Sequence, residues 1–94
     1  MTLDPATAAI LATVERLVVE VAGDEITLAG PLTLTTSFNA DLELESIEFV
    51  ALSEKLQTHY GAQVDFVGWI STKQLDEIIA LTVGDLVAFI AART

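Results

Sequence analysis

The stretch from Asn39 to Phe49 reads NADLELESIEF and marks the boundary between a long connection and a helix. Leu42 and Leu44 alternate with acidic residues up to a single serine, Ser46. After Ser46 the apolar residues change to helical spacing. On spacing alone, Ser46 is the N-cap of this helix, because a serine side chain often accepts hydrogen bonds from the first helical turn.

Downstream of Ser46, the apolar pattern predicts a helix over residues 46–60, which Gly61 ends. One face forms a core stripe with Ser53 beside it: Phe49, Leu52, Leu56 and Tyr60. A second, adjacent face is partly apolar although it lies outside that stripe: Ile47, Val50, Ala51 and Glu54.

Upstream, Asp4 and Pro5 are a capping residue and a first-turn proline, and they predict a helix over residues 5–21 that ends near Gly23. Residues 22–45 then form a connection of a length that usually has a functional reason. We expect an ordered loop, pinned by the apolar side chains Leu28, Leu32, Leu34, Phe38, Leu42 and Leu44. A two-stranded hairpin around Gly30-Pro31 is the alternative.

Two capping signals in the C-terminal third of the sequence predict the starts of two helices. Ser71 with Gln74 precedes a short helix containing Leu75, Ile78 and Ile79. Thr82 with Asp85 precedes a last helix containing Val83, Leu86, Val87 and Ile90. Residues 1–94 therefore read as a single domain of the all-α class: a small four-helix bundle with a long loop between helices 1 and 2 and a short helix 3.

Composition excludes several classes of function. The 94 residues are 52% hydrophobic and contain no cysteine and one histidine, so disulfides and thiolate metal sites are excluded. Four basic residues against fourteen acidic ones give a formal charge of −10, which disfavours nucleic acid and anionic membranes as partners. Without a long apolar run or a basic leader, we expect a cytoplasmic monomer. The initial Met and capped ends favour a free-standing protein.

Neither catalysis nor metal binding explains the serine among carboxylates. His59 is the only histidine and lies thirteen residues beyond Ser46, about 20 Å along a helix at 1.5 Å per residue. Serine-nucleophile chemistry needs a base within hydrogen-bond reach, so we expect no enzyme. A calcium loop starting at Asn39 would need glycine and glutamate where Leu44 and Val50 stand, so we expect no metal.

A third interpretation treats Ser46 as a site of covalent modification and the helix after it as a docking face. A phosphodiester at a helix N-terminus meets free N–H groups and the positive end of the helix dipole. The neighbouring carboxylates would be recognised by basic partners, and the exposed apolar residues would supply contact energy. The candidate docking residues are Glu45, Ile47, Glu48, Val50, Ala51 and Glu54.

Two segments resemble the acyl carrier protein family of the fatty-acid and polyketide type: SFNADLELESIEFVALSEKLQTHYGAQV (residues 37–64) and LTVGDLVAFI (residues 81–90). The resemblance implies a non-catalytic carrier in which Ser46 bears 4′-phosphopantetheine and holds acyl groups as thioesters. It aligns Asp41-Leu42 with the family's Asp-Leu pair, and Glu48 and Glu54 with its acidic recognition surface. It also implies a phosphopantetheinyl transferase, acyl-loading enzymes and condensing enzymes as partners.

The chain departs from the family in several places. The tripeptide is Glu-Ser-Ile instead of Asp-Ser-Leu, and Glu43 stands where glycine is frequent. The segment between Val64 and Leu81 is longer and carries Trp69, which with Phe49 could fill the space of a long acyl chain. We therefore expect a short or polar cargo, in polyketide or other secondary-metabolite biosynthesis rather than fatty acid biosynthesis. The alternatives are a peptidyl or aminoacyl carrier and an unmodified helical protein-interaction module with an acidic docking face.

Overall fold

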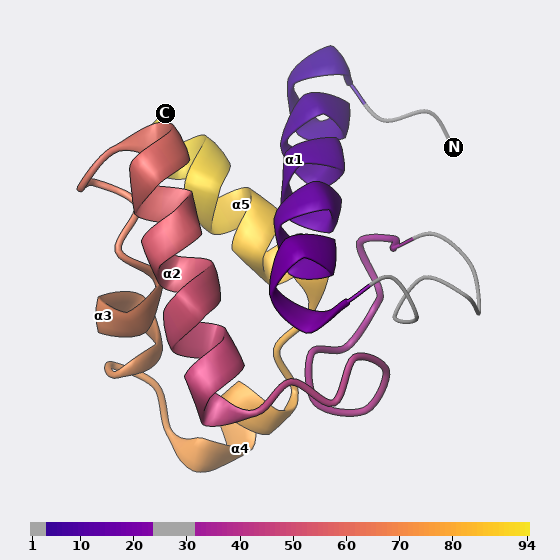
Figure 1. Cartoon of the computed structure of the whole chain (residues 1–94), viewed down its shortest axis with the longest axis vertical. Coiled ribbons are helices and arrows are strands. Elements are labelled where there is room, and N and C mark those ends of the chain that lie inside the picture. The colour runs from indigo at the N-terminus through magenta and orange to yellow at the C-terminus, as the bar shows by residue number, and fades with distance from the viewer. Residues whose placement is uncertain (1–3, 24–31) are drawn as a thin grey trace.

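The computed structural model describes residues 4–23 and 32–94, which form five helices and confirm the all-α class (Figure 1). Their bounds are α1 Pro5–Ala22, α2 Ser46–Tyr60, α3 Phe66–Ile70, α4 Leu75–Ile79 and α5 Val83–Arg93. The bounds of α2 are those predicted, and α4 is the predicted short helix. The described residues contain one helix more than the predicted four, because a short helix, α3, forms between α2 and α4.

Helix α1 packs against both α5 and α2, and α3 packs against α2. The Asp4 carboxylate accepts a hydrogen bond from the Thr7 N–H at 3.3 Å and so caps α1 as predicted. Hydrogen bonds from Thr7 hold the pKa of the Asp4 carboxyl below its usual value. Gly23 ends the helix with φ 100°, a backbone conformation that favours glycine.

Three phenylalanines from separate elements meet in the core. Phe38 comes from the long loop, Phe49 from α2 and Phe66 from α3, with ring centroids 5.8–6.0 Å apart. Phe38 and Phe66 are fully buried. Tilted aromatic pairs at this spacing stabilise beyond the area that they bury. We call this cluster the phenylalanine triangle, and it fixes the loop to the start of α2.

The described part of the long loop is ordered, as predicted, because its backbone completes the first turn of α5. The Val83 N–H donates to the Thr36 carbonyl and the Gly84 N–H to the Leu34 carbonyl, each at 2.8 Å. The Phe38 N–H donates to the Leu81 carbonyl at 3.1 Å. The first N–H groups of a helix lack acceptors within the helix, so the loop carbonyls supply them. Its apolar anchors in this part are buried or partly buried: Leu32, Leu34, Phe38, Leu42 and Leu44.

The capping signal at Ser71 and Gln74 was assigned wrongly. Ser71 is the C-cap of α3, and Gln74 is itself the N-cap of α4, where its N–H donates to the Glu77 carboxylate at 3.0 Å. Asp65 caps α3 by accepting from the Gly68 N–H at 3.0 Å. The signal at Thr82 and Asp85 is confirmed as a reciprocal box at the start of α5.

Part of the predicted loop lies outside the described residues: Leu28 and the hairpin turn at Gly30-Pro31. Over residues 4–23 and 32–94, none of the helices has the length and apolarity that crossing a membrane requires.

Candidate attachment site and docking face

The candidate attachment residue, Ser46, is the first residue of α2. The N-cap is Glu45, not Ser46 as spacing alone had predicted. The Glu45 carbonyl accepts from the N–H groups of Glu48 and Phe49, both at 3.0 Å, and the Glu45 N–H donates to the Glu48 carboxylate at 2.8 Å. The first turn of α2 is therefore capped by the two glutamates. The side chain of Ser46 is outside the described part of the structure.

In residues 41–45, which lead into α2, the apolar side chains point into the core and the acidic side chains lie at the surface. Leu42 and Leu44 are buried, whereas Asp41, Glu43 and Glu45 are exposed. The alternation seen in the sequence therefore places carboxylates at the surface beside the start of α2. Glu43 has φ 52°, in the left-handed region that favours glycine.

An apolar pocket of about 350 Å³ lies next to the start of α2. Its walls come from the loop, α2, α3 and α4: Leu44, Phe49, Val50, Val67, Ile70, Leu75 and Ile78. Phe49 also belongs to the phenylalanine triangle, so that cluster lies behind this wall of the pocket. Figure 1 shows α4 beneath the start of α2 and α3 beside it, in agreement with these walls.

The predicted docking residues form an outward ridge along α2. Ile47 is 74% exposed and Val50 is 47% exposed, while Ala51 and Glu48 are half-buried and Glu54 is exposed. Val50 borders the apolar pocket, whereas Ala51 and Glu54 border a different hollow of about 500 Å³. The two ends of the predicted face therefore adjoin two chemically different surfaces.

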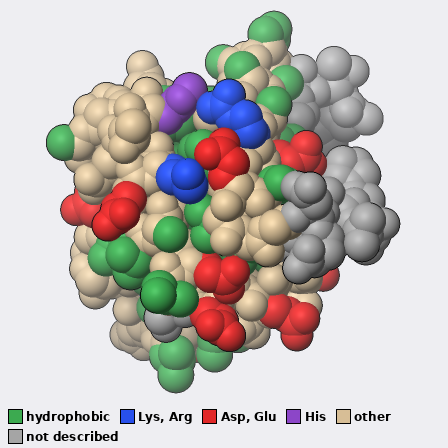
Figure 2. Space-filling model, in the orientation of Figure 1, with side chains coloured by type: hydrophobic (Ala, Val, Ile, Leu, Met, Phe, Trp, Pro, Cys, Tyr) green, Lys and Arg blue, Asp and Glu red, His purple; other side chains and the backbone are tan. Residues whose placement is uncertain are grey.

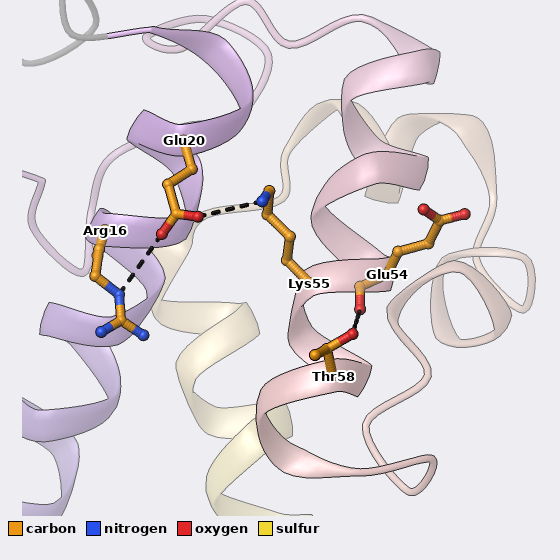
Figure 3. A network of polar contacts seen from close by, with 5 residues as sticks. All are labelled: Arg16, Glu20, Glu54, Lys55 and Thr58. Carbon is orange, nitrogen blue, oxygen red and sulfur yellow. Dashed lines mark hydrogen bonds and ion pairs between the residues drawn. The ribbon is translucent and has the colours of Figure 1, made fainter.

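This second hollow is a polar groove between α1 and α2. The Lys55 ammonium and the Arg16 guanidinium contact the two oxygens of the Glu20 carboxylate, at 3.2 Å and 3.7 Å (Figure 3). Figure 3 also shows the Glu54 carboxylate pointing away from this network, while its backbone carbonyl accepts from the Thr58 hydroxyl at 2.9 Å. Figure 2 shows basic side chains and the histidine on the upper part of this face, with a carboxylate between the basic groups and further carboxylates at the sides and below.

Helix α3, one wall of the apolar pocket, is anchored on α2 and α5. Ser53 is a buried polar side chain, and its hydroxyl oxygen accepts from the Val67 N–H at 3.2 Å. Trp69 stacks on Phe89 of α5 with ring centroids 4.4 Å apart. Trp69 does not line the apolar pocket, so of the two aromatic residues expected to fill it only Phe49 contributes.

Sequence reasoning did not assign the pocket walls contributed by α3 and α4: Val67, Ile70, Leu75 and Ile78. The available signal was the apolar spacing in α4, where Asp76 and Glu77 lie between Leu75 and Ile78. That spacing indicated a helix, but it could not show that one side of this helix remains uncovered.

No protein-family profile matches this chain, and no curated protein or solved structure is significantly similar to it.

Proposed function

We propose that this chain is an acyl carrier protein in which Ser46 bears 4′-phosphopantetheine. The observation that carries the proposal is the position of Ser46 in the chain: it is the first residue of α2, it follows exposed carboxylates, and the same helix contributes Phe49 and Val50 to the walls of an apolar pocket. When attached, the arm supplies a thiol that holds an acyl group as a thioester.

The start of α2 fits a phosphodiester. The first turn of a helix presents N–H groups that lack acceptors within the helix, together with the positive end of the dipole. Part of this capacity is used, since the Glu48 N–H bonds to the Glu45 carbonyl and the Glu48 carboxylate is held by the Glu45 N–H. The capping glutamates Glu45 and Glu48 hold the backbone of this first turn.

The backbone leading into the site supports the resemblance at one of its departures. Glu43 stands where the resembled family frequently has glycine, and it adopts a left-handed conformation that glycine adopts without strain. The side chain differs from the family's pattern, while the backbone has the conformation that the glycine would favour. The backbone conformation at Glu43 is thus a separate observation from the residue identities on which the resemblance was based.

The pocket favours a cargo different from the short or polar group expected from the sequence. Its walls are apolar throughout, with Phe49 and aliphatic side chains around about 350 Å³. Burying apolar atoms there is favourable by about 25 cal/mol per Å² removed from water, whereas an unpaired polar group would be penalised. We therefore infer an aliphatic acyl group of modest length.

A second candidate function is an unmodified protein-interaction module. The exposed Ile47 and Val50 favour it, because such side chains can bind a partner without any tether. The two functions differ in whether Ser46 is modified.

The test is the intact mass of the apo protein after incubation with coenzyme A and a broad-specificity phosphopantetheinyl transferase. The wild-type protein is expected to gain the mass of one arm and the Ser46→Ala variant none. Ser71→Ala is the matched control, since it removes an exposed hydroxyl that bonds only to the Gly68 carbonyl in α3. A Ser46→Ala protein that is loaded like the wild type would exclude this attachment site.

A further inference from the structure

Among the side chains that the structure describes, Ser53 is the one polar group buried in the core, with 4% of its surface exposed. The apolar residues near it on α2, Leu52 and Leu56, are fully buried. A buried hydroxyl costs free energy unless it has a hydrogen-bond partner. The partner of Ser53 therefore indicates what this side chain contributes.

That partner is a backbone group of α3. The Ser53 hydroxyl oxygen accepts a hydrogen bond from the Val67 N–H at 3.2 Å. Val67 is the second residue of α3, and the first N–H groups of a helix have no acceptor within that helix. The Asp65 carboxylate accepts from the next of these groups, the Gly68 N–H, at 3.0 Å. Ser53 thus completes the cap of α3 from a different helix.

A second side chain of α2 holds the same end of α3. The Gln57 amide donates to the capping carboxylate of Asp65 at 3.3 Å. Ser53 and Gln57 are four residues apart, so they lie on one side of α2. Helix α3 has five residues and contains Gly68, so its own tendency to form a helix is small. Its position therefore depends on these contacts with α2 and on the stacking of Trp69 on α5.

The position of α3 determines the size of the apolar pocket. Val67 and Ile70 of α3 form one part of its wall, and Phe49 and Val50 of α2 form another. Ser53 follows Val50 by three residues and Phe49 by four, so it continues the same side of α2. Its hydrogen bond to Val67 thus fixes the separation of α2 and α3 at one edge of a pocket of about 350 Å³.

We propose that Ser53 is a positioning residue that limits the length of the acyl group held in the apolar pocket. This inference rests on the proposed carrier function and extends it by naming the residue that sets the size of the cargo. Helix α3 can move away from α2 only by breaking the bond between Ser53 and Val67, which leaves the buried hydroxyl without its partner. The cost of that loss opposes an acyl chain longer than the pocket.

The test variant is Ser53→Ala, which removes the hydrogen bond and keeps α2, because alanine is the best helix former. Ser53→Thr is the conservative variant, since threonine retains a hydroxyl at this position. Val14→Ala is the control for a general loss of stability. Val14 is fully buried in α1, whereas the described walls of the pocket come from the loop, α2, α3 and α4.

Each protein is loaded by the transferase from butanoyl-, hexanoyl-, octanoyl- and decanoyl-coenzyme A. The readout is the rise in Tm of each acylated form above the form that carries the arm alone. Each methylene removed from water adds stability, so Tm should rise with chain length until the pocket is full.

We expect the wild type to reach a plateau in Tm within this series, and Ser53→Ala to reach its plateau at a longer chain. Ser53→Thr should restore the wild-type plateau. Val14→Ala should lower Tm for every form and leave the plateau at the wild-type chain length. If Ser53→Ala is unfolded, Gln57→Ala removes the other contact with the start of α3 at a half-buried position, and the same shift is expected.

The outcomes separate this inference from the carrier function. A wild-type plateau in folded Ser53→Ala, or in Gln57→Ala where it takes its place, would show that these contacts stabilise the fold without limiting the cargo. Equal Tm values for all acylated forms of the wild type would exclude the pocket as the cargo site and overturn the inference, while the arm on Ser46 would stand. A wild-type protein that accepts no arm would overturn the carrier function itself.

Discussion

At the scale of single residues, the start of α2 depends on a strained glutamate. Glu43 has φ 52°, a conformation that costs a residue with a side chain roughly 1–2 kcal/mol. The strain occurs between the buried Leu42 and Leu44, whose packing fixes the backbone on both sides. The position of Glu45, and with it the first turn of α2, follows from this arrangement.

We predict that Glu43→Gly stabilises the fold by about 0.5–1 kcal/mol, since relief of the left-handed strain exceeds the entropic cost of glycine in the unfolded chain. Glu43→Ala is the control, because it removes the same carboxylate and keeps the strain. The difference in free energy of unfolding between the two variants is measured by urea denaturation. Equal stability of the glycine and alanine variants would show that position 43 is not strained.

At the scale of elements, the long loop and α5 form one unit. Gly84 allows the loop to approach the first turn of α5: a Cβ atom there would lie 2.6 Å from the Leu34 carbonyl oxygen. The Gly84 N–H donates to that same oxygen, so the hydrogen bond requires the close approach. The loop in turn carries Phe38 and Leu42 into the core and delivers the chain to α2.

Gly84→Ala should therefore destabilise the protein by about 1–3 kcal/mol, as overpacked sites do, although alanine is the better helix former by about 1 kcal/mol. Ala88→Gly, at an exposed position of the same helix, measures the difference in helix propensity between alanine and glycine without any change in packing. Thermal or urea unfolding monitored by circular dichroism gives both values. A Gly84→Ala variant more stable than the wild type would show that the loop backbone at Leu34 does not lie too close to α5 for a side chain at position 84.

The elements predicted correctly from the sequence had long apolar patterns with strong caps. Asp4-Pro5 and the period that follows predicted α1, and the change of period at Ser46 predicted the bounds of α2. Helix α3 was missed because it has five residues, contains Gly68 and is apolar on more than one side. Its N-cap at Asp65 was a readable signal that the prediction did not use, and Ser71, which was assigned to the start of the next helix, is the C-cap of α3.

The candidate site was only partly predictable for a related reason. Helical spacing identified Ile47 and Val50 as lying outside the core stripe, and both are exposed. In α4, spacing alone did not distinguish a covered face from an open one, so Leu75 and Ile79 were not recognised as surface residues. Their exposure depends on how α3 and α4 sit beside α2, which is determined by contacts between distant segments.

At the scale of the whole molecule, acidic side chains outnumber basic ones by fourteen to four. Figure 2 shows two basic side chains close together with a carboxylate between them, and further carboxylates over the rest of this face. The exposed carboxylates of Asp41, Glu43 and Glu45 lie just before the start of α2. An approaching basic protein therefore meets an uneven field, which favours association at the start of α2 and raises the association rate.

We predict that Glu45→Gln with Glu48→Gln lowers the association rate with the transferase several-fold at low salt and weakens its salt dependence. Glutamine at position 48 keeps an acceptor for the Glu45 N–H, so the helix cap is retained. Glu54→Gln, beside the polar groove, should have a smaller effect. Stopped-flow association at several ionic strengths provides the measurement, and identical salt slopes for the double variant and the wild type would contradict the electrostatic role.

The central claim concerns which atom of the molecule carries the tether. Tandem mass spectrometry of wild-type protein, after treatment with coenzyme A and the transferase, locates the added group directly. The account predicts a single phosphopantetheine on Ser46 in essentially all molecules. No added mass under conditions in which a known carrier is fully converted, or an arm on another hydroxyl such as Ser37, would contradict it.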